Sequence, residues 1–150
     1  MELQDTSEAI SDYIRKCSHI IHTKGHHIAK EFGLTYDQYH LLIYLMELDT
    51  PPTINEISNK SNRAQNTISE KISRLEGKGL VKRINDVCDR RITRVAITED
   101  GLKLIKDIKK ERSNRVIYAA LSKMEEVEVD NLLSALEKLY NNLKEGNGID

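Results

Sequence analysis

The chain has 150 residues, of which 39% are hydrophobic and 31% are charged, and its formal net charge is −1. This length fits one compact domain with an added dimerisation arm, and the composition is typical of a folded, helix-rich protein rather than a disordered one. No apolar run approaches the ~20 residues of a membrane span, and the chain start lacks a signal-peptide pattern. We therefore expect no membrane partner and a cytoplasmic location.

The charge is unevenly distributed along the chain. Between Lys60 and Arg94 there are ten basic and four acidic residues, a net charge of +6, so the remainder of the chain must sum to −7. A basic segment on an otherwise acidic chain is the electrostatic pattern of a phosphate-binding face, because each neutralised phosphate releases condensed counterions.

The two cysteines, Cys17 and Cys88, lie far apart and outside any Cys-x-x-Cys pair, so we expect neither a disulfide nor a thiolate zinc site. Cys17 falls on an apolar stripe and is interpreted as a small hydrophobic core residue. Cys88 lies in a polar turn, where oxidation would alter a surface. Both are candidate redox residues.

Hydrophobic periodicity predicts the first half of the fold. Apolar residues recur at three-to-four spacing from about Ser7 to Glu31, which indicates one long amphipathic helix. A second helix is predicted to begin after Leu34, with Thr35 as its N-cap, and to end before Pro51-Pro52.

Two short helices joined by a polar turn then give a helix-turn-helix pattern. The first begins at Thr53 or Asn55 and ends between residues 59 and 62, and the second covers Arg63 to Glu76. The buried stripe predicted for the second helix consists of Ala64, Ile68, Ile72 and Leu75.

The next segment is predicted to be a β-hairpin, because β-branched runs at residues 80–84 and 92–97 flank a polar turn at residues 85–91. Thr98, followed by two acids, predicts the start of a further helix that continues to about Leu121. Ser122 and Glu125 have the spacing of a capping box that opens the last helix.

The terminal helices carry more leucine and isoleucine than a small winged domain can cover, which favours packing against a second copy of the chain. We therefore predict dimerisation helices at residues 1–34 and 101–145, a DNA-binding domain at residues 35–100 and a frayed tail at residues 146–150. A two-fold dimer would present two reading helices to successive major grooves, about 34 Å apart.

Several motifs follow one another in a recognisable order. They are Ile57-Ser58-Asn59-Lys60-Ser61, Asn66-Thr67-Ile68-Ser69, Leu75-Glu76-Gly77-Lys78-Gly79-Leu80-Val81, Asp89-Arg90-Arg91 and Thr98-Glu99-Asp100-Gly101. Together they resemble the MarR family of bacterial winged helix-turn-helix regulators, and the flanking helices extend the resemblance over nearly the whole chain.

The resemblance implies a mainly α fold with a small β-hairpin wing. It also implies a homodimeric regulator that binds a pseudo-palindromic operator in double-stranded DNA, by default a repressor released by a small-molecule, metal or redox signal. The alternative is a winged-helix protein-interaction module without specific DNA readout. No nucleophile elbow, phosphate-binding glycine loop, dinucleotide fingerprint or His-Glu-x-x-His motif occurs, so an enzyme is not expected.

Amides, hydroxyls and arginines on the outer helix face can bond phosphates or base edges, although an ordinary solvated face is the alternative. Glu70 either accepts a bond from cytosine or holds Arg74, and both interpretations stay open. Arg91 resembles the family's wing arginine, which enters the minor groove, with Asp89 orienting its guanidinium. The candidate DNA-binding residues are Asn62, Arg63, Gln65, Asn66, Thr67, Ser69, Arg74, Asp89, Arg90 and Arg91.

Histidines lie on one face of the first helix at a spacing that lets imidazoles share a metal ion or titrate together near neutral pH. The alternative is a cluster that lines a ligand pocket without metal, and the nearby tyrosines are explained equally well by core packing. No cofactor is required, and the metal is unknown. The candidate effector-binding residues are His19, His22, His26, Tyr36, Tyr39 and His40.

Overall fold

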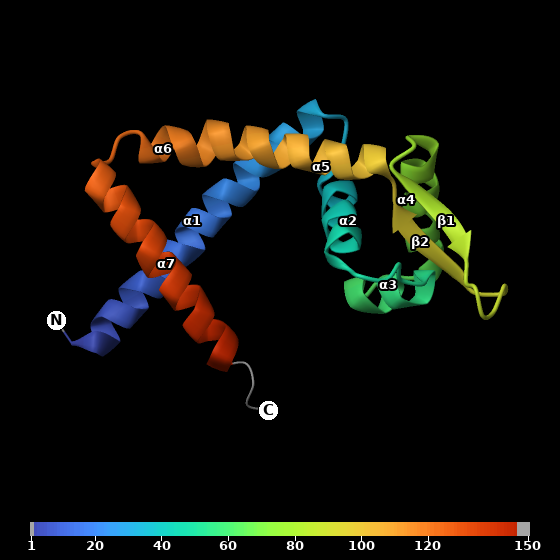
Figure 1. Cartoon of the computed structure of the whole chain (residues 1–150), viewed down its shortest axis with the longest axis horizontal. Coiled ribbons are helices and arrows are strands. Elements are labelled where there is room, and N and C mark those ends of the chain that lie inside the picture. Colours follow the sequence, from blue (N-terminus) through green and yellow to red (C-terminus); the bar gives the residue numbers. More distant parts are fainter. Residues whose placement is uncertain (1, 147–150) are drawn as a thin grey trace. The chain divides into compact units, whose positions relative to one another are not determined.

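The computed structural model describes residues 2–146, and the chain divides into two compact units, one up to Arg112 and one from Ser113 onward. Within its described residues, the first unit contains five helices and one hairpin (Figure 1). These are α1 (Leu3–Glu31), α2 (Tyr36–Glu47), α3 (Ile54–Ser61), α4 (Gln65–Gly77), β1 (Val81–Asn85), β2 (Thr93–Ile97) and α5 (Glu99–Arg112). The predicted mainly α fold with a β-hairpin is confirmed.

Reciprocal side-chain caps start α2 and α3. The Thr35 hydroxyl accepts from the Gln38 N–H at 3.2 Å, and the Gln38 side chain accepts from the Thr35 N–H at 3.1 Å. Thr53 and Glu56 form the same pair, at 3.1 and 3.2 Å. Each box satisfies two backbone donors that the first helical turn leaves unpaired, so α3 begins after Thr53 rather than Asn55.

The turn between α3 and α4 consists of residues 62–64, and α4 begins at Gln65, two residues later than predicted. Asn62 ends α3 in the left-handed region, with φ of 52°, and the Arg63 N–H donates to the Ser58 carbonyl at 3.1 Å. Ala64, predicted to be buried, is instead the exposed N-cap of α4, because its backbone is still extended. The other predicted stripe residues, Ile68, Ile72 and Leu75, are buried.

The winged domain has its own apolar core. Fully removing such an aliphatic side chain from water stabilises the fold by about 1.5–3 kcal/mol. The largest fully buried side chains come from the α1–α2 connection, from α2 to α5 and from both strands: Leu34, Leu42, Ile57, Ile72, Leu75, Val81, Val95, Ile105 and Ile108.

The hairpin pairs Val81 with Ile97 at its base and Asn85 with Thr93 near its tip, in antiparallel register. It is also tied to the segment before α3. The Val95 N–H donates to the Pro52 carbonyl at 2.8 Å. The Arg94 guanidinium donates to the Pro51 carbonyl at 2.8 Å and to Asp86 at 2.6 Å. The two prolines, predicted only as a helix boundary, therefore anchor the hairpin.

Helix α5 begins where predicted. The Thr98 hydroxyl accepts from the Gly101 N–H at 3.1 Å and donates to the Gly79 carbonyl at 2.7 Å. Gly101 is needed for close approach, because a Cβ there would overlap the Leu80 carbonyl oxygen and lie 2.7 Å from Cγ1 of Ile97. The absence of a side chain lets the first turn of α5 pack directly on the base of the hairpin.

The second unit consists of a π-helical segment η1 (Ser113–Tyr118), α6 (Ala119–Leu121) and α7 (Glu126–Gly146). The predicted capping box at Ser122 is wrong, because Ser122 keeps a helical backbone and its hydroxyl donates to the Ala119 carbonyl at 2.9 Å. Instead, the Glu125 N–H donates to Glu128 at 2.9 Å. Of the predicted tail, Gly146 ends α7 and residues 147–150 lie outside the described residues.

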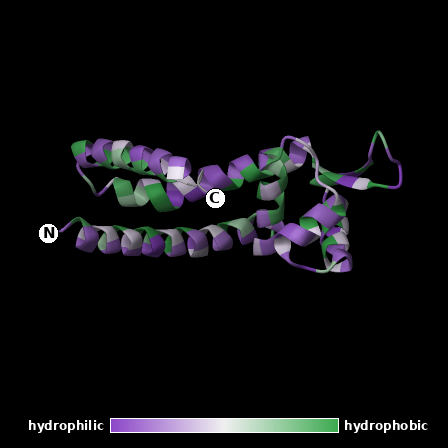
Figure 2. Ribbon diagram, turned by 90° about the horizontal axis from the view of Figure 1, so that it is seen from below, coloured by the Kyte–Doolittle hydropathy of each residue, from purple (hydrophilic) through white to green (hydrophobic). Residues whose placement is uncertain are grey.

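Two helices leave apolar side chains uncovered in the single chain. Hydrophobic and hydrophilic residues alternate along both α1 and α7 (Figure 2). No helix within residues 2–146 is long and apolar enough to cross a membrane. The exposed large hydrophobic residues are Leu3, Ile10, Tyr13, Ile14 and Ile20 on α1, and Val127, Leu132, Leu133, Leu136, Tyr140 and Leu143 on α7.

Gly101→Ala should destabilise the first unit by about 2–4 kcal/mol, because the added methyl group must push α5 away from Leu80. Urea unfolding followed by circular dichroism measures this loss. Gly77→Ala is the matched control, since nothing lies within 4 Å of a Cβ at Gly77. Equal stability of the two variants would contradict the proposed close packing.

Candidate nucleic-acid interface

The outward face of α4 lines an open groove of about 600 Å3 together with the start of α3. Three predicted DNA-binding residues, Gln65, Asn66 and Ser69, meet there. The Gln65 amide donates to Oδ1 of Asn55 at 2.7 Å, which holds its side chain against α3. Thr67, also predicted, is exposed on the same helix.

A hydrogen-bond network around Arg83 joins this face to the hairpin. From β1, the Arg83 guanidinium donates to Glu76 and to the Ser73 hydroxyl at 2.9 Å each, and to the Ser69 carbonyl at 2.9 Å. The Arg83 N–H, and then its guanidinium, hold the pKa of the Glu76 carboxyl below its usual value. The sequence marked Arg83 as basic but gave no sign of these partners, which are up to fourteen positions away.

Glu70 pairs with Arg74 at 3.3 Å, which matches one of the two interpretations that the sequence left open. Both side chains are 68% exposed, and an exposed pair one helical turn apart contributes only about 0.3–0.5 kcal/mol. The pair therefore positions Arg74 weakly and leaves it free to turn toward another anion.

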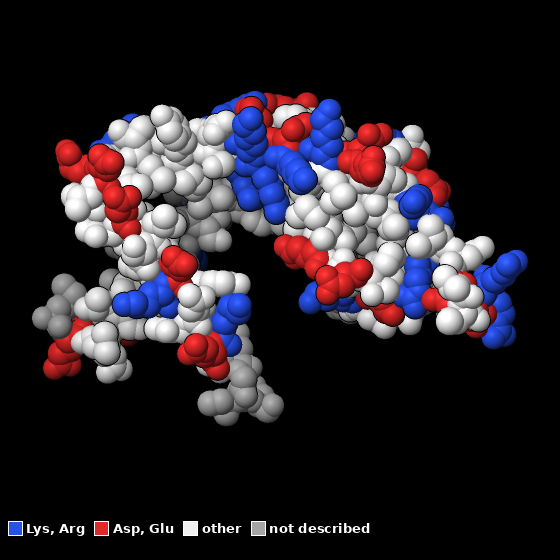
Figure 3. All heavy atoms as spheres, in the orientation of Figure 1, with Lys and Arg blue, Asp and Glu red and all other residues white. Residues whose placement is uncertain are grey.

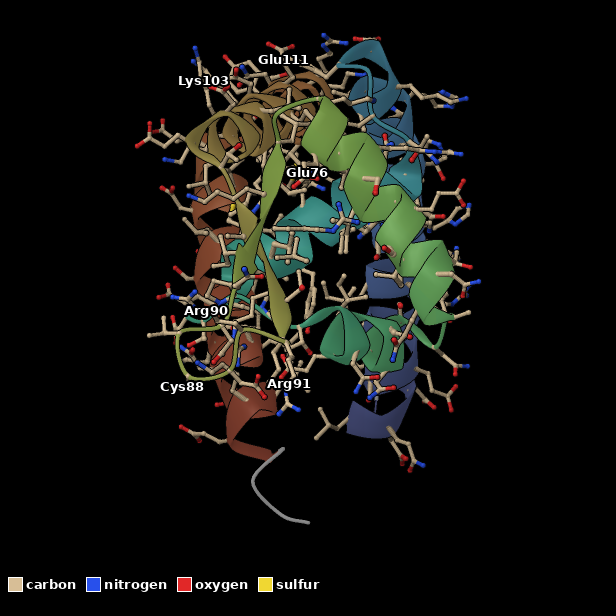
Figure 4. All side chains as sticks on the ribbon, turned by 90° about the vertical axis from the view of Figure 1, so that its right-hand side faces the viewer. Glu76, Cys88, Arg90, Arg91, Lys103 and Glu111 are labelled. Carbon is tan, nitrogen blue, oxygen red and sulfur yellow. The ribbon has the colours of Figure 1, made fainter. Side chains whose placement is uncertain are left out.

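At the hairpin tip, Arg91 forms a two-pronged pair with Asp89, with Nε and Nη2 each 3.1 Å from a carboxylate oxygen. Asp89 thus orients the guanidinium as expected, while the Arg91 side chain stays 90% exposed. The hydrogen bond from the Arg91 side chain lowers the pKa of Asp89. Arg90 and Cys88 lie in the same loop (Figure 4).

The loop conformation comes from Asp86. One of its carboxylate oxygens accepts the N–H groups of Cys88 and Asp89, at 2.8 and 3.1 Å, and the other accepts from Arg94. The Arg94 bond, followed by these N–H bonds, lowers the pKa of Asp86. The tip is therefore held in one turn geometry, from which basic side chains project at the edge of the unit (Figure 3).

Helix α4 and the hairpin lie side by side, in contact through β1 (Figure 4). The structure thus brings the predicted helix face and the predicted wing together on one surface. Two predicted residues, Asn62 and Arg63, lie in the turn just before α4.

Arg63 contacts a residue that the sequence did not single out. Its Nη1 lies 3.4 Å from Asp37 Oδ2, and Lys71 Nζ lies 2.9 Å from the same oxygen. The hydrogen bond from Lys71 is the main cause that lowers the pKa of Asp37. Asp37 is in the first turn of α2, and the three side chains line a pocket of about 310 Å3 between α2, α3 and α4.

Five of the six candidate effector residues lie together where α1 meets α2. Tyr36 contacts His22, His26 and His40, with ring centroids 4.7, 5.0 and 4.2 Å apart. His22 and His40 stack at 5.1 Å, and Tyr39 meets His40 edge-on at 5.6 Å. We call His22, His26, Tyr36 and His40 the ring cluster.

The ring cluster adjoins an open pocket of about 340 Å3, lined by residues that include His22, His26 and Tyr36. The Tyr39 hydroxyl is buried and has no hydrogen-bond partner among the described residues. The sixth candidate, His19, makes no ring contact in the cluster, and its carbonyl accepts from the Thr23 hydroxyl at 2.9 Å.

The metal hypothesis receives no support from the described residues, and the redox hypothesis for the two cysteines stays a prediction. Within residues 2–146, no three His, Cys, Asp or Glu side chains are arranged to hold a metal ion. Cys17, predicted to be a core residue, is exposed in the single chain because α1 has buried residues only from Gly25 onward. Cys88 is also exposed.

The sequence pattern described as transcriptional regulator SarA/Rot matches residues 24–108, which is more than half of the chain. The chain belongs to the SarA/Rot family of transcriptional regulators. This is a MarR-like winged-helix family, so the predicted resemblance and the winged helix-turn-helix architecture are confirmed. Its members are transcriptional regulators, the class that the sequence favoured over an enzyme.

Known proteins agree with this assignment. The chain is 32% identical over 99 residues to YsmB, an HTH-type transcriptional regulator of Bacillus subtilis, covering 66% of this chain and 67% of YsmB. The structure of a MepR point mutant from S. aureus, bound to an oligodeoxyribonucleotide, is 26% identical, with a TM-score of 0.68, over 89% of this chain and 97% of that one. The transcriptional regulator Tm0710 of Thermotoga maritima has the same fold, with a TM-score of 0.87 at 22% identity over 95% of this chain and 99% of that one.

Stability of this SarA/Rot regulator should decrease on mild acidification through His40. Partial loss of water around its ring, and then repulsion from His22, lower the pKa of His40, while Asp37 acts in the opposite direction. The folded state therefore prefers neutral His40. The contribution of this preference to stability is present above the unfolded pKa of about 6.5 and is lost as the pH falls below it.

The urea concentration at the unfolding midpoint should therefore decrease as the pH is lowered from about 7.5 to about 5.5. His40→Gln should make this decrease smaller. His19→Gln is the control, because His19 lies outside the ring cluster. A fall that is equally large in wild type and His40→Gln would show that other groups cause it.

Proposed function

We propose that this regulator binds double-stranded DNA sequence-specifically, with α4 in the major groove and the hairpin tip in the adjacent minor groove. The observation that carries the proposal is the side-by-side arrangement of the polar face of α4 and the basic hairpin. The MepR mutant with an oligodeoxyribonucleotide bound supports it by similarity at 26% identity.

The two parts suit different kinds of readout. Asn66 and Gln65 carry amides, which pair with adenine edges in the major groove, and Arg74 carries a guanidinium group, which pairs with guanine. Arg91 is 90% exposed and pre-oriented by Asp89, so it can enter a narrow minor groove, where the negative potential is concentrated, and read its width. Phosphate contacts from the turn and from Arg90 would set the register.

We propose further that the functional unit is a homodimer. The exposed apolar residues of α1 and α7 need a cover, and a second copy supplies one with self-complementary surfaces. Residues 1–34 and 101–145 then act as dimerisation helices and residues 35–100 as the DNA-binding domain. Two copies of α4 suit a pseudo-palindromic operator.

The regulatory role that fits best is repression of a promoter. This role would require that the protein is cytoplasmic. The ring cluster and the open pocket beside it offer a site for a small-molecule signal, lined by side chains of α1 and α2. Its aromatic walls favour a planar ligand. Binding there would release the DNA.

The assignment of roles on the interface can be tested by two substitutions. Arg91→Ala should weaken binding to many duplexes together and reduce the salt slope by about one for each copy in the dimer, whereas Asn66→Ala should cost about 1–3 kcal/mol at one base pair of each half-site and relax specificity there. Selection from a random duplex pool, followed by fluorescence anisotropy at several salt concentrations, measures both effects.

Arg15→Ala is the control for charge loss, since Arg15 is exposed on α1 and pairs only with Asp12 in the salt bridges described. The reverse pattern of effects would overturn the assigned roles. Failure of the wild type to bind any duplex at low salt would favour the winged-helix interaction module instead.

The dimer is tested by placing charges on the apolar face of α7. Leu133 and Leu136 are 67% and 47% exposed in the single chain, and replacing both by Glu would bury charges at the proposed interface. The variant should sediment as a monomer and bind its operator at least about a hundredfold more weakly. Lys138→Glu is the control on another face of α7, and a monomeric wild type would refute the dimer.

A further inference from the structure

Two cationic side chains, one on α4 and one in the turn before it, contact the same carboxylate. Lys71 on α4 and Arg63 in the turn before it lie 2.9 and 3.4 Å from the same oxygen of Asp37. The Lys71 side chain is 21% exposed, and those of Arg63 and Asp37 are each 46% exposed. The carboxylate thus partly neutralises two cations of the surface through which we propose that DNA is bound.

The pocket around this carboxylate is suited to an anion. Lys60 and Ser61, at the end of α3, line it as well, so three cationic groups and a hydroxyl line one pocket. The rest of its wall consists of Leu41, Ile57 and Ile68 together with His40 and Tyr44. The three cations that line the pocket exceed the charge that the one carboxylate can balance.

We propose that this pocket is a binding site for a phosphate of the DNA backbone, and that the Asp37 carboxylate occupies it as an internal anion in the free protein. The inference rests on the proposed DNA binding. When the duplex docks, a phosphate oxygen takes the place of the carboxylate between Arg63 and Lys71, and Asp37 turns toward water.

Energetics allow this exchange. Ion pairs that are this exposed contribute little to stability, so they are easily replaced. A phosphate offers two charged oxygens to the Arg63 guanidinium and Lys71, a geometry that arginine in particular matches. The hydrogen bond from Lys71 keeps the pKa of Asp37 low, so the carboxylate is charged at neutral pH and competes with the phosphate.

Asp37 would therefore limit the affinity of the protein for the DNA backbone. By repelling phosphates and occupying two cations, it lowers the binding of every duplex by the same factor, because phosphate contacts carry no base information. It would thereby restrain nonspecific binding, while the base contacts of α4 keep their full effect on specificity.

The test is Asp37→Asn in the full chain, with binding of a selected operator and of a random duplex measured by anisotropy over a range of salt concentrations. Both duplexes should bind about five- to thirtyfold more tightly at low salt, with a salt slope steeper by about one to two per dimer. Asp100→Asn is the matched control, because Asp100 occupies the first turn of α5 as Asp37 does that of α2.

Lys71→Gln provides a second test. Alone it should weaken binding to both duplexes, and combined with Asp37→Asn it should remove most of the gain, because the freed cation is then missing. Urea unfolding of each variant verifies that it is folded. An ion pair that only ties α2 to α4 would instead lower stability in Asp37→Asn without any gain in affinity.

The outcomes separate the two proposals. A wild type that binds no duplex refutes the DNA-binding function, whereas a wild type that binds while Asp37→Asn shows no gain refutes only the phosphate site. Calorimetric titration with inorganic phosphate distinguishes the source of the anion. Micromolar binding of free phosphate to Asp37→Asn would overturn the assignment to the DNA backbone and indicate a small-anion site.

Discussion

The DNA-binding surface that we propose depends on how the hairpin is held against α4, because in this proposal the two parts enter two grooves of one duplex. Apolar packing supplies the first restraint, since Leu75 on α4 and Val81 and Val95 on the strands are almost completely removed from water. Arg83 supplies the second by bonding Glu76, Ser69 and Ser73 at once. The result is a fixed spacing between the helix face and the wing, which a rigid duplex requires.

The basic residues of the winged domain divide into groups with different tasks. Arg83 and Arg94 are committed to the fold through several internal bonds each. Arg91 is oriented but exposed, and Arg63 and Lys71 share the single carboxylate of Asp37. The net charge of +6 between Lys60 and Arg94 already subtracts the acids that pair inside this segment, so only Asp37, which lies outside it, lowers the charge further in the free protein. Counting charges finds the surface but does not say which cations it presents.

Sequence reasoning succeeded where the deciding partners are close along the chain. Thr35 and Gln38 are three residues apart, so their cap was predictable, and the hairpin followed from two β-branched runs around a polar turn. It failed at Ser122, where the correct spacing for a cap occurs on a helical backbone. It also missed the contact of Asp37 with Lys71, which lies 34 residues further along, because only the tertiary fold brings the two side chains together.

The proposed signal site and the proposed phosphate site share one turn of helix. His40 stacks on His22 in the ring cluster, and the same residue lines the pocket that holds Asp37. Tyr36 and Asp37 are adjacent in the first turn of α2, so a ligand that shifts the backbone of this turn would move both side chains. A signal of this kind needs no long pathway through the protein. It needs only a ligand that binds one arrangement of that turn more tightly than the other, and the difference in affinity sets the extent of DNA release.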